Sequence, residues 1–329
     1  MLILSADDVS MALPMEQTVE AMKSAYRALS SGQAQVPQRV RLEVSPYDGI
    51  SLCMPSYVRD PAGDALAVKV VSVFSANSKR GLPLIHAAVL VLEADTGRPL
   101  ALLEGSTLTA IRTGAASGAA TEVLARTDSQ VMALFGAGAQ GRTQLEAVCS
   151  VRRIRTAWVY DLDSAKIRKL IAELAGRGPI PADLRPASNP EQAVMEADVI
   201  CTATTAPTPV FSDGHLKPGV HINAVGSYTP QMQEIPSETV TRALVIVDSR
   251  SASLAESGDL LQPIREGRFT ESHIHAELGE LLLGRKAGRT DPAQITLFKS
   301  VGVAVQDAMA AQLALRNAQK LGLGQSVEL

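Results

Sequence analysis

Three closely spaced glycines after an apolar run constrain this chain more than any other feature. The stretch VMALFGAGAQGRTQLEA at 131–147 sets Gly136, Gly138 and Gly141 in the pattern G-x-G-x-x-G. The residues before the glycines predict a strand over 131–135, and those after them predict a helix over 139–149. In that setting the glycines allow a tight turn, close approach of a pyrophosphate to the backbone, and close packing of helix on strand. The stretch therefore predicts a dinucleotide site at the start of a helix.

The residues that follow alternate between strands and helices. Strands are predicted in TAWVYD, DVICTAT, VHINAVG and ALVIVD, and helices over 140–150 and 164–175. Such alternation is typical of parallel βαβ units in an open, doubly wound sheet.

The N-terminal part is richer in strands. A helix is predicted over 14–31 from an apolar face made by Val19, Met22, Tyr26 and Leu29. Strands are predicted within 36–59, at 66–74, at 86–94 and after a turn at 94–100, with Pro37, Pro46 and Pro55 marking turns. Ser106 is the predicted cap of a helix that runs to about Arg126. A long amphipathic helix over 295–320 ends the chain, and we expect it to return to this N-terminal unit.

Composition limits the class of protein. The chain of 329 residues is long enough for two domains, and its net charge of −3 with 3% aromatic residues argues against a nucleic-acid partner. Cys53, Cys149 and Cys201 are distant and odd in number, which predicts reduced thiols rather than a disulfide framework. Asp7 and Asp8 occupy the place where an export signal needs an apolar core. We therefore expect a cytoplasmic protein with no membrane partner. We also expect no metal site, because His273 and His275 are the one close pair of histidines.

An acidic residue after the next predicted strand bears on the nucleotide. Asp161 lies twenty residues past Gly141, where a carboxylate can bind the hydroxyls of the adenosine ribose. A carboxylate there would repel a 2′-phosphate. The sequence therefore favours NAD(H) and leaves NADP(H) as the alternative. A helix-capping role for Asp161 in the same turn is compatible with binding of the ribose.

Five stretches of the chain together resemble the ornithine cyclodeaminase/mu-crystallin family. They are KVVSVFSANSKRGLP (69–83), DTGRPLALLEGSTLTAIRTGAASGAAT (95–121), FGAGAQGRTQ (135–144), INAVGSYTP (222–230) and LFKSVGVAVQD (297–307). The resemblance implies an α/β fold in which a Rossmann-type doubly wound parallel sheet is inserted into a discontinuous α+β domain for substrate binding and dimerisation. We expect residues 1–125 with 300–329 to form that domain and residues 126–299 to form the dinucleotide-binding domain. The resemblance also implies a homodimer.

Three basic residues occupy unusual places. Arg39 precedes a strand-like run, Lys69 interrupts an apolar one, and Arg112 lies in a helix of small residues. A buried charge is costly unless it is paired, and a guanidinium suits a carboxylate because it can bind both oxygens. By resemblance, Arg39 and Arg112 bind the substrate carboxylate, and Lys69, the predicted catalytic residue, contacts the carboxylate or the reacting nitrogen. The alternatives are a solvated Arg39, a Lys69 that reaches solvent from an edge strand, and an Arg112 paired with Glu104 or Glu122.

Further residues complete the predicted sites. Met54, with Leu52, would flank a small apolar ring, His86 can donate a proton near neutral pH but is more often a core residue, and Tyr228 follows a later strand; the three are assigned to the substrate. The predicted cofactor site consists of Thr113, Gly136, Gly138, Ala139, Gln140, Asp161, Thr202, Ala203, Thr204, Val225, Gly226, Ser227, Lys299 and Ser300. Thr202, Ala203, Thr204, Lys299 and Ser300 can equally be turn or capping residues.

Two positions bear on the reaction. By resemblance, cyclodeaminases carry an aspartate where this chain has Tyr228 and a further acid where it has Leu52. Acid–base catalysis needs a proton-exchanging group in reach, so we predict NAD(P)H-dependent reduction of a small 2-imino acid instead. Δ1-Pyrroline-2-carboxylate or Δ1-piperideine-2-carboxylate would give L-proline or L-pipecolate, with Lys69, Tyr228 or water as the proton donor. The alternatives, in order, are an acyclic imino acid that gives L-alanine or L-aspartate, ornithine cyclodeamination, and a non-enzymatic binding protein.

Overall fold

The computed structural model describes residues 1–328, apart from the side chain of Ser78. The chain forms two compact units. The discontinuous unit comprises Met1–Arg112 and the chain from Val303 onward, and the inserted unit comprises Thr113–Gly302. One boundary lies inside helix α3 (Gly105–Leu124), so the domain limits that we expected at 125/126 and 299/300 stay a prediction.

The discontinuous unit is built on an eight-stranded sheet in the order β16-β1-β7-β6-β5-β4-β2, with β3 also paired to β4. Its strands are β1 (Leu2–Leu4), β2 (Ala34–Gln35), β3 (Val40–Val44), β4 (Gly49–Val58), β5 (Ala65–Phe74), β6 (Ile85–Leu92), β7 (Pro99–Glu104) and β16 (Gln325–Ser326). Its helices are α1 (Ala6–Ala12), α2 (Met15–Ser31), α11 (Ala304–Leu321) and the short 3-10 turns η1 (Ser45–Tyr47) and η2 (Ser75–Arg80).

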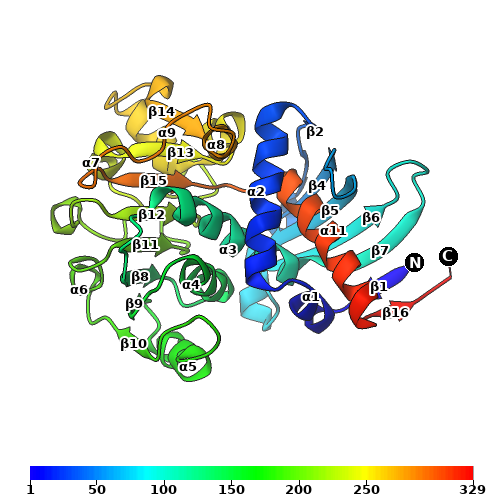
Figure 1. Ribbon diagram of the computed structural model, residues 1–329. Helices are drawn as coiled ribbons and strands as arrows, with labels where there is room; N and C mark the ends of the chain where they lie inside the picture. The colour runs from blue at the N-terminus through cyan, green and yellow to red at the C-terminus, as the bar shows by residue number, and fades with distance from the viewer. Residues whose placement is uncertain (329) are drawn as a thin grey trace. The chain divides into compact units, whose positions relative to one another are not determined.

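Helices α2 and α11 pack against each other, and α11 also lies on β4, β5 and β6 of this sheet (Figure 1). The predicted apolar face of α2 is confirmed, since Val19, Met22 and Tyr26 are fully or nearly fully buried. Helix α2 ends at Ser31 because Gly32 takes a left-handed conformation, with φ of 78°. The last helix therefore joins the N-terminal unit, as the sequence predicts.

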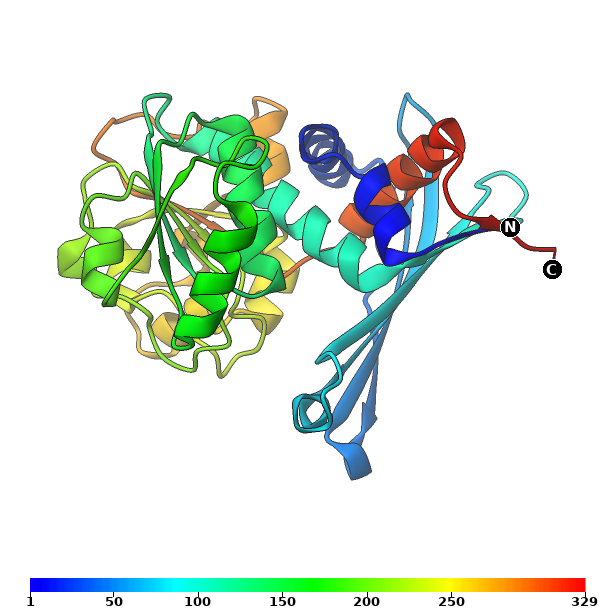
Figure 2. The same ribbon diagram turned by 90° about the horizontal axis from the view of Figure 1, so that it is seen from below.

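The register of the strands decides which side chains lie beneath α11. Met54 on β4 is opposite Lys69 on β5, and Lys69 is opposite Val89 on β6. Because successive side chains of a strand alternate between faces, Lys69 and Met54 share the face under α11, while Ser72 and its partner His86 lie on the other face. The sheet end that carries β3, η1 and η2 extends past the helices of this unit (Figure 2).

The inserted unit contains a second eight-stranded sheet, in the order β10-β9-β8-β11-β12-β15-β13-β14, with every pair parallel. Its strands are β8 (Val131–Phe135), β9 (Thr156–Tyr160), β10 (Asp183–Pro186), β11 (Val199–Thr202), β12 (His221–Ala224), β13 (Leu244–Val247), β14 (Ile274–Glu277) and β15 (Thr296–Lys299). Its helices are α4 (Ala139–Val151), α5 (Ser164–Leu174), α6 (Pro190–Val194), α7 (Ser237–Arg242), α8 (Arg250–Glu256), α9 (Gly258–Arg265), α10 (Leu278–Leu282), η3 (Asp213–His215) and η4 (Glu271–His273). This is the Rossmann-type, doubly wound parallel sheet that the alternating pattern predicts.

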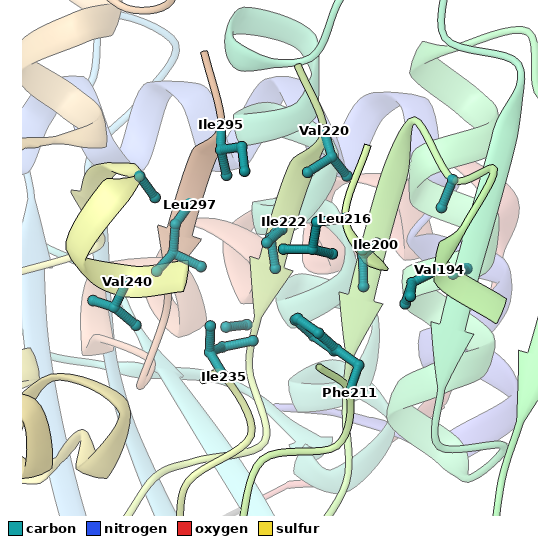
Figure 3. Close-up of a cluster of buried hydrophobic side chains, with 14 of the residues drawn as sticks. Val194, Ile200, Phe211, Leu216, Val220, Ile222, Ile235, Val240, Ile295 and Leu297 are labelled. Atoms are coloured by element: carbon teal, nitrogen blue, oxygen red, sulfur yellow. The ribbon is translucent and has the colours of Figure 1, made fainter. Parts of the chain in front are cut away.

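A mainly aliphatic core covers one face of the inserted sheet. Ile200 of β11, Ile222 of β12 and Leu297 of β15 lie in one buried cluster with Phe211 and Val240 (Figure 3). Each of these side chains is at most 6% exposed. Burial of such side chains from neighbouring strands stabilises the sheet.

Three local predictions are wrong. The predicted helix over 295–320 begins only at Ala304, because the apolar, β-branched stretch before it forms the central strand β15 and Gly302 separates the two with φ of 83°. Ser106 does not cap α3; the carboxylate of Glu104 accepts hydrogen bonds from N of Ser106 and N of Thr107, each 2.8 Å long. Pro55 marks no turn but lies inside β4, opposite Val68 of β5 and between the residues paired with β3 and those paired with β2.

Among the described residues, every helix is too short or too polar to cross a lipid bilayer.

Candidate functional site

The discontinuous unit holds a buried ion pair on the sheet face under α11. Nζ of Lys69 lies 2.7 Å from Oδ2 of Asp307, and each side chain is only 2% exposed. Lys69 comes from the middle of β5 and Asp307 from the first turn of α11. The lysine that interrupts an apolar run is therefore paired inside the fold, and the alternative of a lysine extended to solvent is wrong.

Arg112 completes this cluster from α3. Its Nε donates to the other oxygen of Asp307, Oδ1, at 3.0 Å, and its Nη1 donates to Oε1 of Gln306 at 2.9 Å. The amide of Gln306 in turn donates to the hydroxyl of Tyr26 at 2.9 Å. Arg112 therefore pairs with Asp307, and the alternative pairing with Glu104 or Glu122 is wrong. Two cations share one carboxylate, which leaves a net positive charge for an anionic ligand.

The pKa of Lys69 is lowered from its usual value of 10.5 to about 8. Burial is the largest cause, and the charges of Arg112 and Arg39 act in the same direction, while Asp307 opposes them. An amine with this pKa exchanges its proton near physiological pH, which a solvent-exposed lysine does not. Because the charge of Arg39 contributes to the lowered pKa of Lys69, Arg39 lies within electrostatic range of the lysine.

The other residues predicted for the substrate divide into two groups. Met54 is buried, shares the face of Lys69, and forms an apolar cluster with Val71 and Ala304 that also touches Leu52. His86 is exposed on the opposite face of the sheet, so the chain does not bring it to Lys69 and Arg112. Sequence proximity to the same loop does not fix the face of a strand, and the assignment of His86 to the substrate stays a prediction. Tyr228 belongs to the inserted unit, where it is 37% exposed and burial raises its pKa.

The glycine turn has the geometry that its sequence predicts. Gly136 has φ of 98°, and a Cβ on it would lie 2.5 Å from the carbonyl oxygen of Ala203. A Cβ on Gly141 would run into the carbonyl oxygen of Gly136. Gly138 has no atom in front of its Cβ position, so the backbone there is open to a ligand. The turn leads into α4 at Ala139, and no described side chain caps the N-terminus of this helix, whose first N–H groups have no partner within the helix.

Two further observations fit a dinucleotide at this turn. Oε1 of Gln140, in the first turn of α4, is buried and has no hydrogen-bond partner among the described residues. Asp161 follows β9, and its carboxylate accepts from N of Ala137 at 2.8 Å and from N of Asp163 at 2.9 Å. The carboxylate is thus fixed beside the glycine turn. The order of the strands reverses between β8 and β11, and ligands of open parallel sheets bind outside the carboxyl edge at such a point.

Several predicted cofactor residues use their side chains within the fold. Ser227 donates to the carbonyl of Met232 at 2.7 Å, and Ser300 donates to Asp248 at 2.8 Å. Nζ of Lys299 lies 3.0 Å from Oδ2 of Asp259, and both side chains are fully buried. The hydroxyls of Thr202 and Thr204 donate to Glu234. These side chains make contacts within the fold, as the alternative of structural roles expects. The assignment of these residues to the cofactor site therefore concerns their main-chain atoms and stays a prediction.

The remaining assignments lie on the same unit. Thr113 is buried in α3, and its carbonyl accepts from Nε2 of Gln144 at 3.3 Å. The N–H of Val225 donates to the carbonyl of Thr202 at 3.0 Å, which joins the loops after β12 and β11. Among the described residues no three potential ligands gather as a metal site.

Four acidic residues at the centre of these contacts escaped the sequence analysis: Asp307, Glu234, Asp259 and Asp248. Asp248 accepts from Ser300 and from the main-chain N–H groups of Val301 and Gly302. One signal was available, since Asp307 lies in the stretch LFKSVGVAVQD and is followed by an almost uncharged helix. An acidic residue at the start of a helix, however, is ordinarily explained by the helix dipole alone.

The fold and the glycine turn define the class: a dinucleotide-binding protein with a Rossmann-type unit inserted into a second unit that carries a buried cation cluster. The chain belongs to the ornithine cyclodeaminase/mu-crystallin family, whose model matches residues 1–321. It is 41% identical over its full length to the full length of a Δ1-pyrroline-2-carboxylate reductase of Bacillus cereus.

Solved structures agree. The chain is similar to Δ1-pyrroline-2-carboxylate reductase of Thermococcus litoralis in complex with NADH and L-proline, with a TM-score of 0.94 and 44% identity over 99% of this chain and 100% of that one. It is also similar to an archaeal alanine dehydrogenase dimer with bound NAD, with a TM-score of 0.91 and 30% identity over 99% of this chain and 98% of that one.

Proposed function

We propose that this protein reduces Δ1-pyrroline-2-carboxylate to L-proline with NADH. The observation that carries the proposal is the buried cluster of Lys69, Arg112 and Asp307 in a chain that matches reductases of this imino acid over its full length. The net reaction takes one imino acid, one NADH and one proton to one amino acid and NAD⁺.

Arg112 binds the substrate carboxylate. Its Nε and Nη1 are held by Asp307 and Gln306, so the guanidinium has a fixed orientation before substrate arrives. Beside these two contacts, Nη2 is the group offered to the carboxylate. A preset orientation avoids the entropic cost of ordering a long side chain during binding. Arg39 adds the second positive charge.

Lys69 supplies the proton. When bound, NADH would supply the hydride for C2 of the imine, and the ring nitrogen must take up a proton in the same conversion. An ammonium group with a pKa of about 8 is protonated at neutral pH and still gives up its proton readily. Tyr228 is a weaker candidate because burial raises the pKa of its phenol further from neutrality.

The apolar cluster beside Lys69 favours a ring over a second charged group. Leu52 lies where a cyclodeaminase would need an acid, and it packs beside Met54 and Val71. These apolar residues argue against ornithine as the substrate, because they would not compensate the desolvation of its terminal ammonium group. Reduction of an acyclic imino acid is the second candidate, favoured by the similarity to an alanine dehydrogenase.

Asp161 favours NADH over NADPH, because a fixed carboxylate at the ribose position would repel a 2′-phosphate. A homodimer and a cytoplasmic location belong to the same proposal. The outer face of the discontinuous sheet supports the dimer: Val40, Leu42 and Val70 are 64%, 62% and 46% exposed, and the strand register sets them on the face opposite Lys69.

Purified protein tests the proposal directly. With NADH and Δ1-pyrroline-2-carboxylate, the near-ultraviolet absorbance of NADH should fall and chiral chromatography should detect L-proline. Parallel reactions with Δ1-piperideine-2-carboxylate and with pyruvate plus ammonia separate the cyclic from the acyclic candidates. Ammonia release from ornithine without net NADH consumption would identify a cyclodeaminase, and a change in NADH fluorescence without oxidation would identify a binding protein.

A further inference from the structure

A fully buried carboxylate behind the carboxyl edge of the inserted sheet has no role in the chemistry above. Oε1 of Glu234 accepts from N and from Oγ1 of Thr204, each at 2.7 Å. Oε2 accepts from Oγ1 of Thr202 at 2.9 Å and from N of Gly226 at 2.7 Å. Each oxygen therefore binds one main-chain N–H, and the two N–H groups come from different loops.

We propose that Glu234 is a positioning residue that joins the loops after β11 and β12 and so fixes the main-chain surface against which the dinucleotide binds. The inference rests on the proposed use of NADH. Thr202 ends β11, Gly226 follows β12, and the two strands are neighbours in the sheet. The side chain thus ties together two adjacent loops at the edge where the ligand is expected.

The same carboxylate acts on the glycine turn through one intermediate contact. The carbonyl of Ala203, between the two threonines that Glu234 binds, faces Gly136 so closely that a Cβ there would lie 2.5 Å from it. The N–H of Ala203 donates to the carbonyl of Phe135 at 2.9 Å. A shift of the loop after β11 would therefore displace the turn that receives the pyrophosphate.

The hydrogen-bond pattern requires a carboxylate and excludes an amide. Because each oxygen accepts a main-chain N–H, a glutamine in either amide orientation would direct its NH2 group at one of these two donors. Asp259 fixes the main chain of Glu234, because its Oδ1 accepts from N of Glu234 at 2.7 Å. Its other oxygen, Oδ2, pairs with Lys299. Burial and Asp259 raise the pKa of Glu234, while Lys299 and the hydrogen bonds from Thr204 oppose that shift.

The test is Glu234→Gln in the full chain, with NADH affinity measured by fluorescence titration. We expect the Kd for NADH to rise at least about tenfold, which is about 1.4 kcal/mol. The KM for the imino acid at saturating NADH should stay within about twofold, because the substrate cations lie in the other unit. Thr202→Val removes one of the four hydrogen bonds with little change in shape and should give a smaller loss in the same direction.

Asp198→Asn is the matched control. Asp198 also accepts two main-chain N–H groups, from Gln130 and Val131, but it directly precedes β11 at the amino edge of the same sheet. This variant should lose thermal stability and keep the wild-type Kd for NADH. Wild-type affinity in Glu234→Gln, or an equal loss in Asp198→Asn, would overturn the inference.

The proposed function can fail separately. Wild-type protein that binds NADH but does not reduce the imino acid would remove the proposed reaction and leave the role of Glu234 to be decided by the titrations. Wild-type protein that does not bind NADH would overturn both.

Discussion

Lys69 and Arg112 carry like charges in a buried site, and Asp307 makes their proximity possible. Removing water from two cations costs several kcal/mol unless a counter-ion compensates. Asp307 provides one oxygen to each cation, at 2.7 Å and 3.0 Å. The compensation is incomplete for Lys69, whose pKa stays well below its usual value. The same arrangement that makes the lysine a good acid leaves the cluster attractive to a carboxylate.

Imine reduction should depend on pH through Lys69. The protonated form is needed to supply a proton, so kcat/KM should fall as the pH rises through about 8, while L-proline oxidation, which needs the free amine, should increase over the same range. The measurement is a pair of pH profiles in the two directions.

Lys69→Arg is the control for these profiles, because it keeps the positive charge but cannot lose its proton. It should reduce kcat for imine reduction at least about 100-fold and remove the alkaline decline. An unchanged rate in this variant would show that the proton comes from another group.

Individual residues also mark the limit of what the sequence predicts. Lys69 and Arg112 stood out because each interrupts a run of apolar or small residues, where a charge needs a reason. Asp307 did not stand out, since its partner Arg112 is 195 positions away and only the fold brings them together. Glu234 looks like an ordinary acidic residue just before α7. The sequence alone does not show that His86 and Lys69 lie on opposite faces of the sheet, because it does not give the strand register.

At the scale of elements, alternation and periodicity predicted most helices and strands correctly. The errors arose where other contacts outweighed the local sequence pattern. Strand β15 was assigned to a helix because its four residues precede a long helical pattern without a proline between them. Its place between β12 and β13 is decided by pairing on both sides, which is a long-range property. The glycine turn was predicted correctly because its requirements are local: one positive φ, one open Cβ position and one close packing contact.

Gly138 and Gly141 should respond differently to the same change. Gly141→Ala forces a Cβ into the carbonyl oxygen of Gly136, so we expect it to lower Tm, with a cost of about 1–3 kcal/mol, and to weaken NADH binding. Gly138→Ala meets no protein atom and should leave Tm unchanged while it still weakens NADH binding, because the methyl group occupies the ligand's approach. Thermal melts and NADH titrations on both variants decide this. A Gly138→Ala variant with wild-type affinity would contradict the pyrophosphate site.

At the scale of the whole molecule, the proposed dimer depends on the outer face of the discontinuous sheet. Leu42→Glu adds a charge to that exposed apolar face, and the cost of burying it should convert a dimer to monomers. Leu162→Glu is the control, since Leu162 is 94% exposed on the inserted unit. Sedimentation of the wild-type protein should give the mass of two chains, and so should the control. A wild-type protein with the mass of one chain would contradict the dimer.

The position of α11 late in the chain sets the order in which the two units can complete their folds during synthesis. The inserted unit is complete once Gly302 has left the ribosome, whereas the sheet face that carries Lys69 must wait for Ala304–Leu321. Until then the nascent chain holds an unneutralised lysine and an uncovered apolar sheet face, the kind of surface that chaperones bind. Loss of the codons for Val303–Leu329 would therefore spare the nucleotide-binding unit and leave Lys69 without the helix that carries its counter-ion.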